Sequence, residues 1–165
     1  MERKVVGAQT VLARKFYKSR PINYFDYFMK YEKLIIYTDG GARGNPGPAG
    51  IGCVILDEKG NAVAEISKCI GQATNNQAEY QALIAGLTKA KELGAEKIEF
   101  FLDSELVVKQ LNREYRVKDK DLASLFIQAY NLTLGFKKVI FKHVRREKNE
   151  LADRLVNLAL DKAGK

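Results

Sequence analysis

The sequence predicts an α/β fold in which a five-stranded mixed sheet carries helices on both faces. Five apolar runs have the length of strands, and the segments between the later runs have helical periodicity. Strands that alternate with helices after an opening meander require parallel pairing as well as antiparallel pairing. At 165 residues the chain forms one domain, which is large enough to bury about two thirds of its unfolded surface.

The first half of the chain predicts three strands and a long helix. The strands are expected near 34–38, 49–56 and 62–70, and residues 57–61 between the last two have the composition of a hairpin turn. A helix is expected at about 76–92, because its apolar residues recur on one face and Gly94 can cap its carboxyl end. That apolar face comprises Ala82, Leu83, Gly86, Leu87 and Ala90.

The second half predicts two more strands and three helices. Gly135 marks the end of the second of these helices. The expected elements are a strand at 97–102, helices at 104–112 and 120–134, a strand at 137–144 and a closing helix at 149–162.

Two aspartates end strand-like runs that would lie side by side. Asp39 follows the run 34–38, and Asp103 follows the run 98–102. Adjacent parallel strands would bring both carboxylates to one edge of the sheet, where they repel each other and lose solvent. A divalent cation between them resolves this cost, and hard oxygen ligands favour Mg²⁺ or Mn²⁺.

Two further acids lie beside apolar helical faces. Glu79 precedes Leu83 by one turn on the same face, and Asp153 lies beside the apolar stripe of the last helix. An aspartate that closes a strand is also ordinary turn chemistry. The local context of all four acids together favours a functional reading, since Asp39 leads into the glycine-rich stretch 40–47.

At these residues the chain resembles the type 1 ribonuclease H family. The resemblance runs from about Leu34 to about Ala163, in the family's order and spacing, and divides the chain into an extension at 1–33 and a ribonuclease H domain at 34–165. The segments that carry it are Tyr37-Thr38-Asp39-Gly40-Gly41, Asn45-Pro46-Gly47, Thr74-Asn75-Asn76-Gln77-Ala78-Glu79, Asp103-Ser104 and Asn149-Glu150-Leu151-Ala152-Asp153.

The resemblance implies a ribonuclease H-like fold and an endonuclease that hydrolyses the RNA strand of RNA–DNA hybrids, leaving 5′-phosphate and 3′-hydroxyl ends. Two Mg²⁺ ions, which Mn²⁺ can replace, would act on the two sides of the scissile phosphate. Asp39 would bridge both ions, and Glu79 and Asp103 would complete one site. Asp153 would help to hold the ion nearer the attacking water.

The resemblance also implies residues that bind substrate. Amide side chains can donate to and accept from the 2′-hydroxyl that distinguishes RNA from DNA. Gln72 stands where some family members have an arginine that assists in binding a DNA phosphate, which weakens that pocket. An alternative role for Asn75 is that of a helix N-cap. The family positions matched are Gly40, Gly41, Asn45, Asn75 and Asn76 at the minor groove and Thr74 at a DNA phosphate.

Two family features are missing. Many members carry a histidine in the loop before the last helix, whereas His143 lies in a strand-like run and is read as a half-buried or edge-strand residue. Arg145 or Arg146 could take part of its role, since each carries a fixed positive charge. The basic protrusion of some members is also absent, because residues 112–120 are too short for an extra helix.

The formal net charge of +8 favours a polyanionic partner, and residues 1–33 carry +5 of it. These residues interleave basic and aromatic side chains, as nucleic-acid surfaces do. The spacing of Tyr24, Phe25, Phe28 and Tyr31 fits equally well a short helix that packs on the domain or mediates self-association.

The composition of the chain also predicts its location and the role of its two cysteines. Neither a membrane span nor a signal peptide is expected, so a cytoplasmic location is predicted, and no protein partner is implied. Cys53 and Cys69 are expected to be small core residues rather than a zinc site, and a disulfide between them stays open.

Two alternative functions remain open. One is a related nuclease that also cuts double-stranded RNA, and the other is a non-catalytic module that binds nucleic acid. The presence of all four acids speaks against the second.

Overall fold

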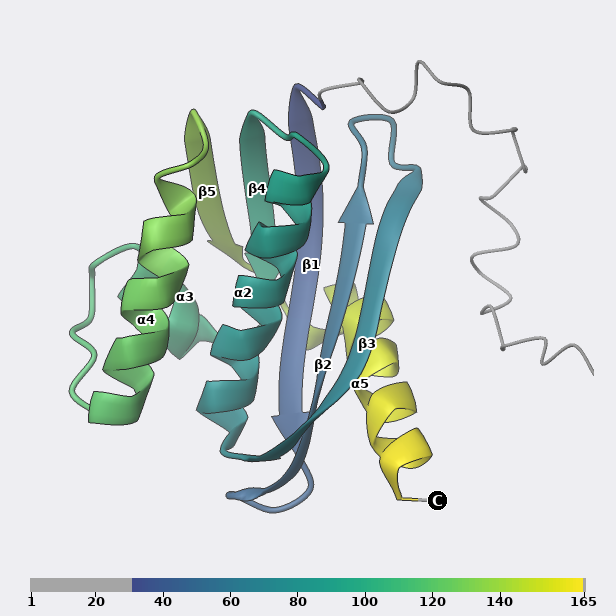
Figure 1. The fold of residues 1–165 in the computed structure, drawn as a ribbon, viewed down its shortest axis with the longest axis vertical. Helices are drawn as coiled ribbons and strands as arrows, with labels where there is room; N and C mark the ends of the chain where they lie inside the picture. The colour runs from purple at the N-terminus through teal and green to yellow at the C-terminus, as the bar shows by residue number, and fades with distance from the viewer. Residues whose placement is uncertain (1–30, 165) are drawn as a thin grey trace, which may run out of the picture.

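The computed structural model describes residues 31–164 and contains one five-stranded sheet in the order β3-β2-β1-β4-β5 (Figure 1). The α/β fold predicted from the sequence is confirmed. Its elements are β1 Lys33–Ala42, β2 Gly47–Leu56, β3 Ala62–Ala73, α2 Asn75–Glu92, β4 Lys97–Leu102, α3 Glu105–Leu111, α4 Lys120–Thr133, β5 Lys138–His143, the 3₁₀ turn η2 Arg146–Lys148 and α5 Glu150–Ala163.

The sheet is mixed, as expected. Strand β1 pairs antiparallel with β2 and parallel with β4, and β4 pairs parallel with β5. The β1–β4 ladder ends at the pair Thr38 and Leu102. The next residue in the chain after each member of this pair is an aspartate, so the register alone places Asp39 of β1 beside Asp103, which directly follows β4.

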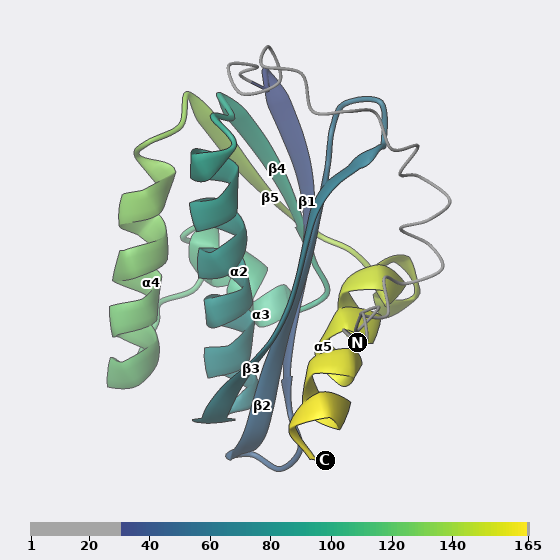
Figure 2. The ribbon, with the colours of Figure 1, turned by 45° about the vertical axis from the view of Figure 1, so that its right-hand side comes forward.

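Helices cover the two faces of the sheet unequally (Figure 2). Helix α2 packs against β1, β2 and β3, and α4 packs against α2 as an outer layer on the same side. Helix α5 lies on the opposite face, against β1, β2 and β3. The main core is therefore enclosed between α2 and the sheet, where residues such as Leu34, Leu83 and Phe100 have no exposed surface.

Strand β1 is longer than predicted. It was expected to end before Asp39, but it continues through Gly40 and Gly41 to Ala42, paired with β2. The two glycines therefore belong to the strand and not to the turn, because the antiparallel partner extends beyond the parallel one. The turn itself occupies residues 43–46.

The amino-terminal end of β1 joins the sheet before residue 34. The carbonyl oxygens of Tyr31 and Glu32 accept hydrogen bonds from the backbone nitrogens of Glu96 and Lys97 at 3.0 Å, and Tyr31 packs against the main core. The predicted stripe residues Tyr24, Phe25 and Phe28 lie outside the described residues. Among residues 31–164, no helix is both long and apolar enough to cross a membrane.

The two cysteines are free thiols on neighbouring strands. Cys53 pairs with Ile66 and Cys69 pairs with Gly50, so the two are not opposite each other. Burial raises the pKa of the Cys53 thiol to about 12, which is the behaviour of a core residue.

Candidate active site

The start of α2 is built to bring Glu79 to the sheet edge. Thr74 caps the helix: its hydroxyl accepts from the Gln77 backbone at 3.2 Å, and the Gln77 side chain accepts from the Thr74 backbone at 2.9 Å. A β-carbon on Gly40 would overlap the backbone of Ala78 and Glu79. Only glycine at position 40 allows the helix to lie this close to β1.

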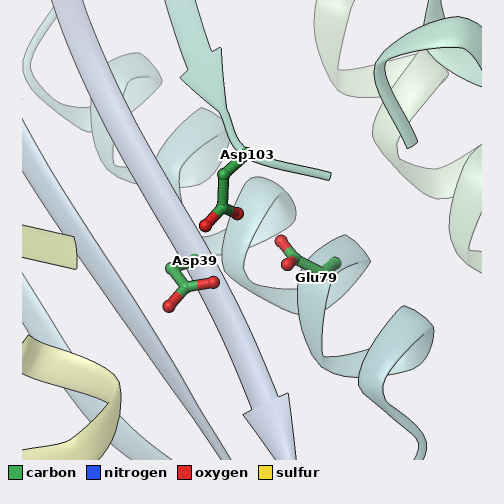
Figure 3. Close-up of side chains that lie close together, drawn as sticks. All are labelled: Asp39, Glu79 and Asp103. Carbon is green, nitrogen blue, oxygen red and sulfur yellow. The ribbon is translucent and has the colours of Figure 1, made fainter. Parts of the chain in front are cut away.

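Three of the four predicted acids meet at this point. One carboxylate oxygen from each of Asp39, Glu79 and Asp103 lies within 4.8 Å of the others, and the three side chains point toward one another (Figure 3). Asp39 and Glu79 are each only 8% exposed, and Asp103 is half-buried. Side chains from β1, from α2 and from the residue after β4, which are far apart in sequence, thus form one acidic cluster.

The cluster is electrostatically strained. Burial, followed by the charges of Asp103 and Asp153, raises the pKa of Asp39 to about 7. Burial and the charges of Asp39 and Asp103 raise the pKa of Glu79 well above its ordinary range. Burial also raises the pKa of Asp103. Acids with raised pKa values and a shared location are characteristic of functional sites.

The cluster fits a divalent cation. Within the described residues, the Oε2 atom of Glu79 is buried and has no hydrogen-bond partner. Unpaired buried carboxylate oxygens are costly, and hard cations take such oxygens as ligands. A cation bound by Asp39, Glu79 and Asp103 would satisfy that atom and remove the mutual repulsion.

Asp153 lies on the same cavity but is held differently. Its Oδ1 accepts from the Arg146 guanidinium at 3.0 Å, and its Oδ2 accepts from the Asn157 amide at 3.2 Å. It is therefore not part of the three-carboxylate cluster. The charge of Arg146 also acts on Asp39 and Asp103, which places this arginine in the electrostatic environment of the site.

The acids open into a surface cavity of about 470 Å³. Of the predicted substrate-binding residues, Gly40, Gly41 and Asn75 line it. Asn45 does not, but its Oδ1 accepts from the Asn75 backbone at 3.1 Å. Asn45 therefore contacts the start of α2, and its role in substrate binding stays a prediction.

The other predicted contacts are placed as follows. Thr74 is the N-cap of α2, so the alternative role of Asn75 as N-cap is wrong. Instead the Asn75 Oδ1 accepts from the Ala42 backbone at 2.9 Å, because Asn75 faces the end of β1. Neither Thr74 nor Asn76 is among the residues that line the cavity.

Of the two candidate arginines, Arg146 lines the cavity and Arg145 does not. His143 is the last residue of the edge strand β5, so the prediction of an edge-strand residue is confirmed. Its side chain is exposed and not half-buried. Its Nε2 lies 3.2 Å from the Asp103 carbonyl oxygen. This contact is to the backbone, and His143 does not line the cavity.

Sequence reasoning missed three polar residues around the site. Asn149 was quoted only as part of a motif, but it is 1% exposed and donates to the Thr38 carbonyl at 2.9 Å, which ties the start of α5 to β1. Asn157 could have been found from its spacing of one helical turn after Asp153. Arg43 lines the cavity and forms an ion pair with Asp161, a contact between distant segments that no sequence signal indicates.

The raised pKa of Asp39 predicts a pH-dependent stability in metal-free buffer. The pKa of Asp39 is about 7 in the folded protein, whereas its ordinary value is 3.8. The contribution of this group to stability is therefore fully present below pH 3.8 and is lost as the pH rises to about 7. In EDTA, we expect the melting temperature to fall by roughly several degrees between about pH 5 and about pH 8. Asp39→Asn should reduce this fall in thermal melts, and an equally steep fall in the variant would contradict the assignment.

Known proteins are similar to this chain in sequence and fold. The family described as "Reverse transcriptase-like" matches residues 37–159. Ribonuclease HI of Halobacterium salinarum is 49% identical over 127 residues, which cover 77% of this chain and 64% of the relative. A bifunctional protein of Mycobacterium tuberculosis is 46% identical over 132 residues, which cover 79% of this chain and 36% of the relative. The chain thus spans about a third of the length of that longer relative.

A solved structure is also similar to this chain. LC11-RNase H1, crystallised in complex with an RNA/DNA hybrid, is 48% identical, and its match covers 80% of this chain and 99% of that one with a TM-score of 0.77. The fold, the acidic cluster and these identities lead to one conclusion: the chain belongs to the type 1 ribonuclease H family.

Proposed function

We propose that this protein is an endonuclease that hydrolyses the RNA strand of RNA–DNA hybrids, giving 5′-phosphate and 3′-hydroxyl ends. The observation that carries the proposal is the buried cluster of Asp39, Glu79 and Asp103, which lies on an open cavity and within the family's fold. A relative of 48% identity has been crystallised with such a hybrid. All four acids expected from the sequence line this cavity.

The four carboxylates would together hold two Mg²⁺ ions. Asp39 would contribute to both ion sites, Glu79 and Asp103 would complete one, and Asp153 would join the other. When bound, the ions would supply an activated water and stabilise charge on the departing oxygen. The mutual repulsion of the clustered carboxylates would favour the binding of cations. Mn²⁺ has the same preference for oxygen ligands and would substitute.

Asn75 is the best placed residue to recognise the 2′-hydroxyl. It lines the cavity, and its Oδ1 is engaged by the Ala42 backbone, which fixes the amide plane. Among the described residues, the Asn75 Nδ2 makes no hydrogen bond with another side chain, so it can donate to substrate. The backbone of Gly40 and Gly41 lines the same cavity and can approach the minor groove closely.

A substrate comparison tests the proposal. The full chain is incubated with RNA–DNA hybrid, duplex RNA, duplex DNA and single-stranded RNA, each with Mg²⁺, Mn²⁺ or EDTA. We expect the hybrid alone to be cut efficiently with Mg²⁺, and nothing to be cut in EDTA. Comparable cutting of duplex RNA would favour the broader nuclease, and hybrid binding without cutting would favour the non-catalytic module. A cytoplasmic location remains a prediction from the sequence.

Arg146 is proposed as an auxiliary residue in place of the missing histidine. It lines the cavity and neutralises Asp153, whereas Arg145 is exposed and away from the cavity. Arg146→Ala should lower turnover at saturating hybrid by roughly tenfold or more, as expected for loss of one positive charge near a reacting phosphate. Arg145→Ala and His143→Gln are the matched controls and should keep most of the activity. A large loss in His143→Gln alone, with unchanged folding, would contradict this assignment.

The basic amino-terminal extension is proposed to strengthen substrate binding. Residues 1–30 contain seven Lys or Arg and two acids, and each phosphate contact adds nearly one unit to the slope of log affinity against log salt. Because Tyr31 packs on the core, the informative variant lacks residues 1–30, so that its chain starts at Tyr31 rather than at residue 34. It should flatten the salt slope by roughly two to four units and leave turnover at saturating hybrid nearly unchanged. An unchanged slope with a much lower melting temperature would favour a packing role.

A further inference from the structure

A second concave surface lies beside α4, apart from the catalytic cavity. It consists of two neighbouring cavities of about 440 and 260 Å³ that share Phe126 and Tyr130 in their walls. We call it the α4 groove. None of its lining residues lines the catalytic cavity.

The floor of the α4 groove is apolar and partly open to solvent. Val117 and Phe126 line the larger cavity, and Val139 and Phe141 line the smaller one. Ile127 on the rim is 57% exposed. An exposed apolar surface within a concavity is characteristic of a binding site rather than of ordinary surface.

The described charged residues that line the α4 groove have one sign. Arg113 and Arg116 line the larger cavity, Lys137 and Lys138 line the smaller one, and among residues 31–164 no aspartate or glutamate lines either. Lys137 pairs with Glu96 at 2.6 Å. Within residues 31–164, no ion pair engages Arg113, Arg116 or Lys138. The groove is therefore complementary to an anionic ligand that also carries apolar groups.

A single nucleic-acid strand fits this surface poorly. Base stacking requires free aromatic ring faces. The Arg113 guanidinium lies 4.8 Å from the Tyr130 ring centre, and Phe126 stacks on the same ring with centroids 6.3 Å apart. The Lys109 ammonium lies 5.0 Å from the Tyr115 ring centre. Tyr115, Phe126 and Tyr130 thus each already contact a cation or another ring.

The chain's own amino-terminal segment is also a poor occupant. Residues 1–30 carry a net charge of +5. The side chains of Arg113, Arg116 and Lys138, which form no ion pair among residues 31–164, would repel them. An anionic segment with apolar side chains matches both the charge and the floor of the groove.

We propose that the α4 groove docks an acidic peptide segment with hydrophobic side chains, supplied by a partner protein. Aliphatic or aromatic side chains of the segment fill the two cavities, and its carboxylates pair with Arg113, Arg116 and Lys138. Because the groove shares no residue with the catalytic cavity, the segment recruits the enzyme without occupying the site of hydrolysis.

Fluorescence anisotropy with a labelled peptide of aspartate, leucine and phenylalanine tests the proposal on the full chain. We expect saturable binding that weakens with salt, and little binding of the same peptide with asparagine in place of aspartate. Ile127→Glu and Arg116→Glu should each weaken binding by roughly tenfold, as for loss of a central contact. The matched control is Leu134→Glu, because Leu134 is 68% exposed at the end of α4 but lines neither cavity. It should bind like the unmodified protein, and hybrid cleavage should be unchanged in all three variants.

Several results would overturn the proposal. Equal binding of the asparagine peptide, or full binding by Ile127→Glu, would show that the groove does not select an acidic segment. Single-stranded oligothymidylate could displace the peptide, and Ile127→Glu could lose the binding of this oligonucleotide. These two results together would show that the groove binds nucleic acid. A melting temperature lowered by many degrees in Ile127→Glu would show that the chain itself covers this residue.

Discussion

Asp39→Asn is expected to reduce hybrid cleavage by roughly a thousandfold or more, which corresponds to about 4 kcal/mol of transition-state stabilisation. Asp39 is the central acid of the cluster: it lies beside Asp103 in the sheet register and within reach of Glu79. The asparagine keeps the shape of the side chain but removes its charge and one anionic ligand atom. The fold should persist, because the lost charge is one that the folded state holds at a cost.

Single-turnover cleavage with saturating hybrid and Mg²⁺ measures this effect, and circular dichroism and hybrid binding in EDTA check the fold. Asp121→Asn is the matched control, since Asp121 is an exposed aspartate in the first turn of α4. It should cleave like the unmodified protein. Cleavage by Asp39→Asn within about tenfold of the unmodified protein, or about 1.4 kcal/mol, would exclude Asp39 as a metal ligand.

Gly40→Ala is expected to have the largest effect on the fold. The added methyl group would overlap the backbone of Ala78 and Glu79, and backbone atoms cannot rotate away as a flexible side chain can. Either α2 moves away from β1 or the strand distorts. We expect a loss of stability of roughly 3 kcal/mol or more, in the range of severe overpacking. Activity should also fall at temperatures where the variant is folded, because displacement of α2 moves Glu79 away from Asp39.

Gly41→Ala is the matched control on the neighbouring residue. Its β-carbon would meet Val156 Cγ1 at 3.5 Å, an ordinary contact. Its melting temperature should stay within roughly a few degrees of that of the unmodified protein. If both variants melt alike, the close approach of α2 to Gly40 does not control the position of Glu79.

The sequence predicted the elements of the fold because each carries a local signal. Strand runs such as 97–102 and the helix before Gly94 were placed within one or two residues of their observed bounds. The pairing of Asp39 with Asp103 also followed, since it requires only that β1 and β4 be parallel neighbours in register. The length of β1 did not follow, because residues 39–42 are held by pairing with β2 beyond the end of the parallel ladder.

The surroundings of the acids depend on contacts that have no local signal. The Asn149 side chain bonds to Thr38, which is 111 residues away in sequence. Position alone did not separate Arg145 from Arg146, because the 3₁₀ turn η2 determines which arginine faces Asp153. The α4 groove likewise arises only when the 112–119 loop packs beside α4, so composition could not indicate it.

Cleavage of a hybrid labelled separately on each strand tests the central claim most directly. With Mg²⁺, the unmodified protein should cut the RNA strand internally, leave the DNA strand intact and produce 3′-hydroxyl and 5′-phosphate ends, and EDTA should stop the reaction. Cutting of the DNA strand, cutting that persists in EDTA, or products with 2′,3′-cyclic phosphate ends would contradict metal-dependent hydrolysis at the cluster of Asp39, Glu79 and Asp103.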